Sequence, residues 1–136
     1  MTDKNSIINV STEYSLDRSV ISIADIIEKA KSMNASTVIV TEKNTLRSAA
    51  EVLTECRRSG IRASMGLRTD FSFQSLIGEI TLIPKDFEGF MEIVRLSGKV
   101  NLKSEKEPVY IEIRDLEEFF SPDKKDTVML FLLQAV

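Results

Sequence analysis

Apolar, β-branched runs alternate with stretches of helical periodicity along this chain. The run STVIVT at 36–41 is uncharged and typical of a strand that is buried on both faces. Apolar side chains then recur at the spacing of one helix face, and Gly60 follows where a left-handed cap would end the helix. The members of that face are Leu46, Ala49, Ala50, Leu53 and Cys56. Strands that alternate with single helices favour parallel pairing through crossovers, so we predict an α/β fold with a mostly parallel sheet.

The rest of the chain continues this alternation. Ser22, three residues before Asp25, predicts the capped start of one helix, and Asp86 predicts the start of another. The chain contains no linker rich in Pro, Gly or Ser, and its 136 residues suit one domain, 1–136. Further strands are expected at 7–10, 61–67, 79–83, 109–113 and 128–133, with a loop around Phe71 and Phe73 and a short acidic segment at 115–120.

The composition excludes several classes of chemistry. The chain contains no histidine, which excludes Ser–His and Cys–His nucleophile arrangements and zinc sites with His ligands. Its single cysteine, Cys56, cannot form an intrachain disulfide, and its place on an apolar helix face predicts a core residue. Most common hydrolase mechanisms are therefore unavailable.

Charge and hydropathy narrow the classes of partner. The formal net charge is -3 and the pI is about 5.1, whereas general nucleic-acid binders carry a basic face, so direct nucleic-acid binding is not expected. The one basic cluster, Arg57, Arg58 and Arg62, is interpreted as the solvated end of a helix. No apolar run reaches about 18 residues and no apolar leader follows a cationic start. We therefore expect a cytoplasmic protein with no membrane span.

Candidate functional residues follow the predicted strands, because chemistry in α/β folds gathers where parallel strands end. Most of these side chains are polar or charged. After the first strand they are Asn9, Ser11, Glu13, Tyr14 and Asp17; after the second, Thr41, Glu42, Lys43 and Asn44; and after the third, Gly66, Arg68, Thr69 and Asp70.

Four ordered segments resemble a known family, the polymerase and histidinol phosphatase (PHP) domain. NVSTEYSLDRS at 9–19 resembles its opening His-x-His-Ser/Thr-x-Tyr-Ser motif, and VIVTEKNTL at 38–46 resembles an apolar strand followed by Thr-Asp-His-x-x-Leu. CRRSGIRASMGLR at 56–68 is similar to the family segment that ends in Gly-x-Glu, and LIPKDFEGFMEIVRLSG at 82–98 is similar to its strand and following helix. The likeness is strongest to the PHP domain at the N-terminus of the bacterial DNA polymerase III alpha subunit.

The resemblance implies a metal site whose ligands have been replaced. Active PHP domains bind metal ions through His, Asp and Glu, and the matching positions here are Asn9, Ser11, Glu42, Lys43 and Arg68. Lys43 and Arg68 would place cations where the family places divalent metals, so we expect no metal, no cofactor and no catalysis. A salt bridge between Glu42 and Arg68 is expected to take the place of the metal site.

The resemblance also implies a truncated fold and a role in binding. A PHP barrel is about twice this length, so the chain is expected to form a half barrel with open sheet edges. Such edges, and the uncharged run at 128–136, favour a homo-oligomer or a protein partner. We predict an inactive PHP-like module that binds or mimics part of a DNA polymerase III replisome. The expected partner is the alpha subunit or the proofreading exonuclease, with 46–58 as the contact helix and a phage or mobile element as the source.

Two other functions stay open on the sequence alone. The first is a residual metal-dependent phosphoesterase that uses carboxylates only, from Glu13, Asp17, Glu42 and Asp70, because Mg²⁺ and Mn²⁺ accept all-oxygen sites. The second is a binder of phosphate or a nucleotide anion through Lys43 and Arg68. Both depend on how these side chains are paired in the fold.

Overall fold

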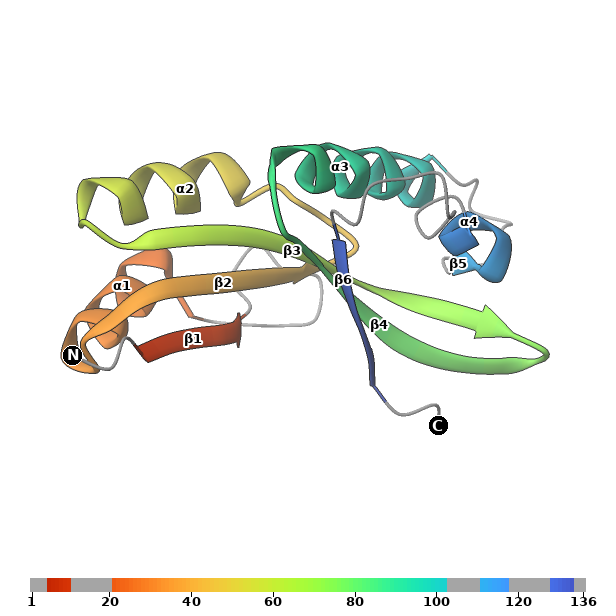
Figure 1. The fold of residues 1–136 in the computed structure, drawn as a ribbon, viewed down its shortest axis with the longest axis horizontal. Helices are drawn as coiled ribbons and strands as arrows, with labels where there is room; N and C mark the ends of the chain where they lie inside the picture. Colours follow the sequence, from red (N-terminus) through yellow and green to blue (C-terminus); the bar gives the residue numbers. More distant parts are fainter. Residues whose placement is uncertain (1–4, 11–20, 103–110, 118–127, 134–136) are drawn as a thin grey trace.

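A single twisted sheet organises the part of the chain that the structure describes (Figure 1). The computed structural model describes residues 5–10, 21–102, 111–117 and 128–133. The strands are β1 (Asn5–Val10), β2 (Ala35–Lys43), β3 (Arg62–Phe73), β4 (Leu76–Pro84), β5 (Ile111–Glu112) and β6 (Val128–Leu133). The helices are α1 (Ile23–Ser32), α2 (Ala49–Arg58), α3 (Phe87–Asn101) and α4 (Ile113–Glu117). Strand order is β1-β2-β3-β4-β6, with β5 beside β3.

The first half of the chain folds as the alternation predicts. β1 pairs with β2 and β2 pairs with β3, both in parallel, with α1 and α2 as the connecting helices. The Ser22 hydroxyl accepts from the Asp25 amide, and the Asp25 carboxylate accepts from the Ser22 amide, which confirms the capping box. Gly60 has a φ of 72°, as the predicted left-handed end of the second helix requires. Local signals were sufficient for these elements.

A β-hairpin replaces the loop expected around Phe71 and Phe73, and that expectation was wrong. β3 runs without interruption to Phe73 and pairs antiparallel with β4. The turn residues Gln74 and Ser75 have φ values of 47° and 68°, which suits a tight two-residue hairpin. Neither is the Gly or Asn that signals such turns in a sequence. Three of the five strand pairings in the described chain remain parallel, and the α/β class is confirmed.

Smaller differences concern element ends. The second helix begins at Ala49 rather than at Leu46, although Leu46 still packs against the core. The strand expected at 109–113 is described only as Ile111–Glu112, and Ile113 already belongs to α4. The acidic segment at 115–120 falls partly in α4 and partly outside the described residues. In these places short apolar runs fitted strand and helix equally well.

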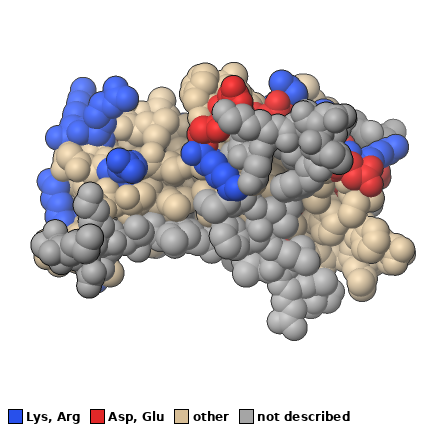
Figure 2. Space-filling model, viewed as in Figure 1, with Lys and Arg blue, Asp and Glu red and all other residues tan. Residues whose placement is uncertain are grey.

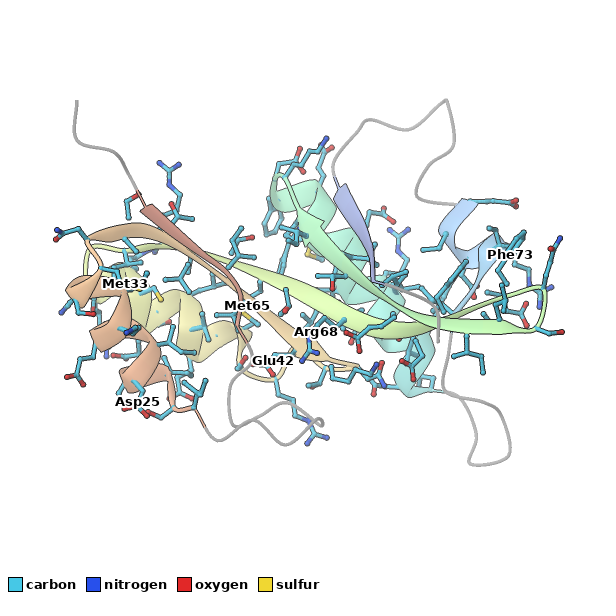
Figure 3. The ribbon with its side chains drawn as sticks, turned by 90° about the horizontal axis from the view of Figure 1, so that it is seen from below. Asp25, Met33, Glu42, Met65, Arg68 and Phe73 are labelled. Carbon is cyan, nitrogen blue, oxygen red and sulfur yellow. The ribbon has the colours of Figure 1, made fainter. Side chains whose placement is uncertain are left out.

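The core lies between the helices and one face of the sheet. Met65 belongs to the apolar cluster that includes the buried side of α1 and α2, and Leu67 belongs to the cluster that includes the buried side of α3. Cys56, at 1 % exposure, is a core residue as predicted. Burial raises the pKa of its thiol, so that a smaller fraction of the side chain is in the reactive thiolate form. Figure 3 shows the molecule from below, with α3 behind β3 and β4 and the side chain of Arg68 in front of it.

Basic side chains gather at the end of the molecule where α1 and α2 terminate (Figure 2). Lys29 and Lys31 lie in the last turn of α1, and Arg57 and Arg58 lie in the last turn of α2. Cations in these positions complement the helix dipoles. Arg58 also pairs with Glu55 one turn earlier, at 2.9 Å.

Candidate functional site

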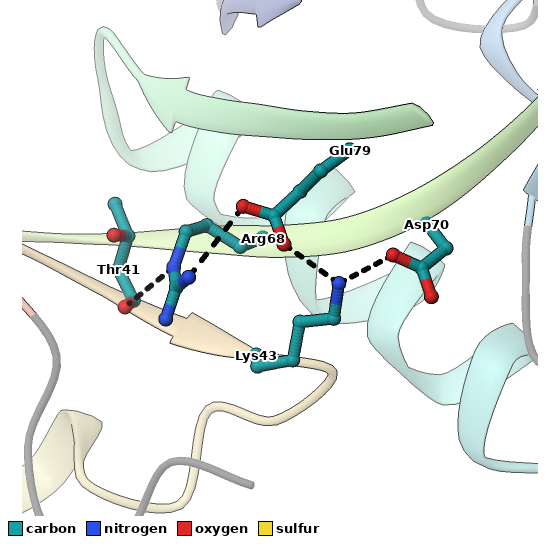
Figure 4. Close-up of polar contacts among 5 residues, drawn as sticks. All are labelled: Thr41, Lys43, Arg68, Asp70 and Glu79. Atoms are coloured by element: carbon teal, nitrogen blue, oxygen red, sulfur yellow. Dashed lines mark hydrogen bonds and ion pairs between the residues drawn. The ribbon is translucent and has the colours of Figure 1, made fainter. Parts of the chain in front are cut away.

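Four charged side chains meet on the sheet face opposite the helices, and we call them the ion-pair cluster (Figure 4). They are Lys43 from β2, Arg68 and Asp70 from β3, and Glu79 from β4. The register explains the meeting, since Lys43 is the partner of Arg68 and Asp70 is the partner of Glu79. Directly paired residues share a face, and Arg68 and Asp70 are two positions apart on the same strand.

The cluster is closely paired. Lys43 Nζ lies 2.5 Å from Asp70 Oδ1 and 2.7 Å from Glu79 Oε2. Arg68 Nη1 lies 3.5 Å from Glu79 Oε1, and Arg68 Nε donates to the Thr41 carbonyl oxygen at 3.4 Å. Side-chain exposure is 16 % for Lys43 and 12 % for Arg68. Glu79 therefore bridges the two cations, one with each carboxylate oxygen.

The charges of the cluster cancel, with two cations against two carboxylates. Burial alone would lower the pKa of Lys43, because it penalises the charged ammonium. The hydrogen bonds to Asp70 and Glu79, together with the charges of these carboxylates, outweigh burial and raise the pKa above its usual 10.5. Lys43 thus stays protonated at neutral pH despite its low exposure.

Glu42 lies on the other face of the sheet, away from the cluster. Its register partner is Leu67, which belongs to the core against α3. Glu42 is fully buried, and its Oε1 accepts from the hydroxyl of Ser48 at 3.1 Å. The predicted salt bridge between Glu42 and Arg68 was wrong. Arg68 shares a face with its register partner Lys43, and Lys43 points to the opposite face from its strand neighbour Glu42. Arg68 pairs with Glu79 instead.

The other predicted residues divide into three groups. Asn9 lies in β1, and Ser11, Glu13, Tyr14 and Asp17 lie outside the described residues. Asn44 follows β2 with a φ of 55°, and its amide donates to the Arg68 carbonyl oxygen at 2.8 Å. The remaining residues lie within strands rather than after them, because β2 continues to Lys43 and β3 continues into the hairpin. These residues are Thr41, Glu42, Lys43, Gly66, Arg68, Thr69 and Asp70.

Sequence reasoning missed Glu79, which joins the two cations of the cluster. The signal was the alternation of polar and apolar residues through 70–73 and 79–82, which would have placed Asp70 and Glu79 on one face. It could be read only if the two segments were recognised as an antiparallel hairpin. The turn at Gln74 and Ser75 gave no such indication.

The side chains at this site do not fit a divalent metal. Ammonium and guanidinium groups are positively charged and offer no lone pair to a metal, which excludes Lys43 and Arg68 as ligands. Asp70 and Glu79 already accept from these cations. Within the described ranges, no three His, Cys, Asp or Glu side chains are grouped closely enough to hold a metal ion. The four side chains instead pair with one another across three neighbouring strands.

A pocket of about 640 Å³ lies beside the first half of β3, between α2 and the start of α3. Residues 62–66 of β3 pair with β2 on one side. On the other side they extend past the end of β4, whose pairing with β3 begins at Leu67. The lining is largely apolar with a basic rim, and includes Leu53, Arg62, Met65, Lys85, Phe87 and Phe90. This pocket is separate from the ion-pair cluster.

Among the described residues, no helix is both long enough and apolar enough to cross a bilayer.

Comparison with known proteins gives a consistent assignment. The family model described as the PHP domain matches residues 8–128. The chain is 27 % identical over 101 residues to the DNA polymerase III subunit alpha of Halalkalibacterium halodurans, a match that covers 74 % of this chain and 9 % of that protein. The chain thus spans a small part of this relative.

Solved structures agree on the fold. One similar structure, titled a "putative metal-dependent phosphoesterase" from Bifidobacterium adolescentis, has a TM-score of 0.58 at 12 % identity, covering 72 % of this chain and 33 % of that one. Another, an amidohydrolase from Chromobacterium violaceum, has a TM-score of 0.52 at 15 % identity, covering 71 % and 35 %. The chain therefore matches about a third of each structure, which suits part of a barrel.

Proposed function

This chain belongs to the PHP domain family, and on that premise we propose that it is a non-catalytic member that acts by binding a protein of a DNA polymerase III type replisome. The observation that carries the proposal is the ion-pair cluster. Lys43 and Arg68 occupy two positions that the sequence motifs align with metal ligands of the family. Asp70 and Glu79 neutralise both cations. A cluster of this kind stabilises the fold and does not catalyse a reaction.

The carboxylate-only phosphoesterase finds little support in this geometry. It requires Glu42 and Asp70 in one site, yet Glu42 is buried on the helix side of the sheet and Asp70 lies on the opposite side. Asp70 is also the closest partner of Lys43. Two of the four proposed ligands therefore cannot converge without refolding of the sheet.

An anion site at Lys43 and Arg68 is also disfavoured. Both cations already face carboxylates, so an incoming phosphate would have to displace Asp70 or Glu79 from a paired arrangement. The displaced carboxylate would lose charged hydrogen bonds worth about 1.5–3 kcal/mol each. A phosphate would therefore have to compete with carboxylates that already neutralise both cations.

The proposed partner follows from the curated relative, which is a replicative polymerase subunit. The alpha subunit or the proofreading exonuclease is the partner we propose. The contact is assigned to the outer face of α2, where Leu53 and Arg57 are exposed and where Leu53 borders the 640 Å³ pocket. An apolar pocket with a basic rim suits a partner segment that carries apolar and acidic side chains. A cytoplasmic location and a phage or mobile-element origin belong to the same proposal.

A pull-down with quantitative mass spectrometry tests this assignment. The tagged chain should retain polymerase III subunits from cells of its native host, and Leu53→Glu with Arg57→Glu should reduce their recovery at least about tenfold. The matched control is Ile77→Glu with Arg114→Glu, which makes the same changes at exposed positions on the hairpin and α4. Equal recovery with both double variants would remove α2 from the contact, and the absence of polymerase III subunits would overturn the proposal.

A further inference from the structure

The outer surface of α3 carries an apolar stripe. Its members are three or four residues apart, which places them along one side of a helix. Their exposure is 74 % for Phe87, 46 % for Met91, 37 % for Val94 and 86 % for Leu102, and Gly98 lies between the last two. The core side of α3, with Ile93 and Leu96 among its buried residues, faces the sheet from nearly the opposite direction. We call these five positions, four exposed apolar side chains and the half-buried Gly98, the α3 stripe.

The spacing of the α3 stripe is that of a helix-pairing seam. From Phe87 to Gly98 the steps are four, three and four residues, which is the alternation that keeps a seam facing a second helix. Gly98 leaves open space, since a Cβ built there would meet no heavy atom within 4 Å. A large side chain of a neighbouring helix can enter that space.

The charged residues beside the α3 stripe indicate which kind of helix could pack against it. Glu88 and Glu92 lie beside the first half of the stripe and Arg95 and Lys99 beside the second half, all on the same side of it at about 100° per residue. Figure 2 shows acidic side chains gathered over the start of α3. A helix that is acidic in its first half and basic in its second complements an antiparallel copy of itself.

We infer that the α3 stripe is a self-association surface, on which a second copy of this chain packs with its α3 antiparallel. In this arrangement Met91 of each copy faces Gly98 of the other, and the two Val94 side chains meet near the two-fold axis. Equivalent flanks of antiparallel helices face one another, so Glu88 and Glu92 approach the Lys99 and Arg95 of the second copy. Parallel pairing would instead oppose the charged flank to the Phe90 flank.

The position of α3 permits this packing. Figure 1 shows the helix on the outside of the sheet, with its axis along the molecular surface. The approach is from the side away from the core, so neither the ion-pair cluster nor the hairpin tip lies in the contact. The inference does not depend on the proposed replisome partner, whose contact is assigned to α2 and the adjoining pocket, although the two surfaces share Phe87.

Sedimentation velocity of the full chain between about 1 µM and 500 µM tests the inference. We expect a monomer–dimer equilibrium, which Met91→Glu weakens at least about tenfold by placing a carboxylate in the seam. Ile77→Glu is the matched control, because Ile77 is 50 % exposed on the hairpin and should leave the equilibrium unchanged. Circular dichroism and urea unfolding verify that both variants fold. A wild-type chain that stays monomeric throughout, or a dimer that Met91→Glu leaves intact, would overturn the inference.

A charge exchange tests the antiparallel orientation separately. The variant E88K/E92K makes the flank basic throughout, and the variant R95E/K99E makes it acidic throughout. Each alone should dimerise more weakly than the wild type through like-charge repulsion, whereas the two mixed should form a heterodimer at low salt. If the mixture associates no better than the separate variants, the antiparallel contact is excluded.

Discussion

Lys43 and Glu79 come from strands that do not pair with each other, yet their side chains meet at 2.7 Å across β3. β2 is part of the parallel half of the sheet, and β4 is part of the antiparallel hairpin. The contact therefore joins the two halves of the sheet at the level of side chains. Asp70 and Arg68, from the strand between them, complete a neutral set of charges.

Removal of Lys43 should destabilise the fold, because it leaves two neighbouring carboxylates without their common partner. We expect Lys43→Met to lower the free energy of unfolding by about 1–3 kcal/mol, as for a partly buried charged hydrogen bond. Urea unfolding of Lys43→Met, Glu79→Gln and the double variant measures the coupling. Additive single effects would show that the contact contributes nothing of its own.

The pH dependence of stability should carry the signature of Lys43. Its pKa is raised above 10.5 in the folded chain, so its contribution is fully present below the pKa of the unfolded state and is lost as pH rises through the folded value. The difference in unfolding free energy between wild type and Lys43→Met should be constant between about pH 7 and pH 9.5 and shrink above pH 10.5. Cys56, whose pKa burial raises, is present in both chains and cancels. A constant difference up to pH 12 would contradict the assignment.

Ser48 is expected to stabilise the fold through Glu42 rather than as a helix cap. Its hydroxyl makes no capping hydrogen bond to α2 and donates to Glu42 Oε1 instead, with both residues fully buried. Ser48→Ala should cost about 1–3 kcal/mol, because a buried carboxylate oxygen loses a donor. Ser32→Ala, at an exposed hydroxyl that donates to the Lys29 carbonyl oxygen, is the control and should change stability by less than about 0.5 kcal/mol. Equal effects in thermal unfolding would refute this role.

Gly66 is expected to be essential for the pairing of β3 with β4. A Cβ at this position would lie 2.6 Å from the Leu82 carbonyl oxygen, a backbone atom that cannot move without breaking the sheet. We expect Gly66→Ala to destabilise by about 1–3 kcal/mol or more. Gly98→Ala is the opposite case, with open space around the Cβ, and should stabilise α3 by about 0.5–1 kcal/mol. Both are best measured in the Met91→Glu background, where self-association does not contribute.

We expect no metal-dependent hydrolysis by this chain. Bis(p-nitrophenyl) phosphate with Mn²⁺ is a suitable assay, because it reports phosphodiesterase activity of many metal sites with one chromogenic product. The rate should match the buffer with Mn²⁺ alone. A Mn²⁺-dependent rate that is lost in Asp70→Asn and in Glu42→Ala, with both variants shown to fold by circular dichroism, would restore the carboxylate-only site.

Local sequence signals were enough for some elements and insufficient for others. The capping pair Ser22 and Asp25, and Gly60 after the second helix, identified helix ends because caps depend on near neighbours only. The hairpin was missed because Gln74 and Ser75 adopt positive φ without the residue types that favour it. Its strand pairing depends on residues that are distant in the sequence.

The candidate site shows the same division between local and long-range information. The positions of Lys43 and Arg68 side by side follow from two adjacent parallel strands, which the sequence predicted. The partner of Arg68 could not be read in this way. Choosing Glu79 over Glu42 requires knowing which face each carboxylate occupies, and that is fixed by the register across β2, β3 and β4.

Titration calorimetry of the purified chain with the purified polymerase III alpha subunit, and with its proofreading exonuclease, tests the central claim most directly. The account predicts a saturable one-site complex with one of the two, at a Kd of about 10 µM or tighter, and at least about tenfold weaker binding for Leu53→Glu with Arg57→Glu. The absence of heat with both proteins at concentrations above about 100 µM would contradict a replisome-binding role for this PHP domain.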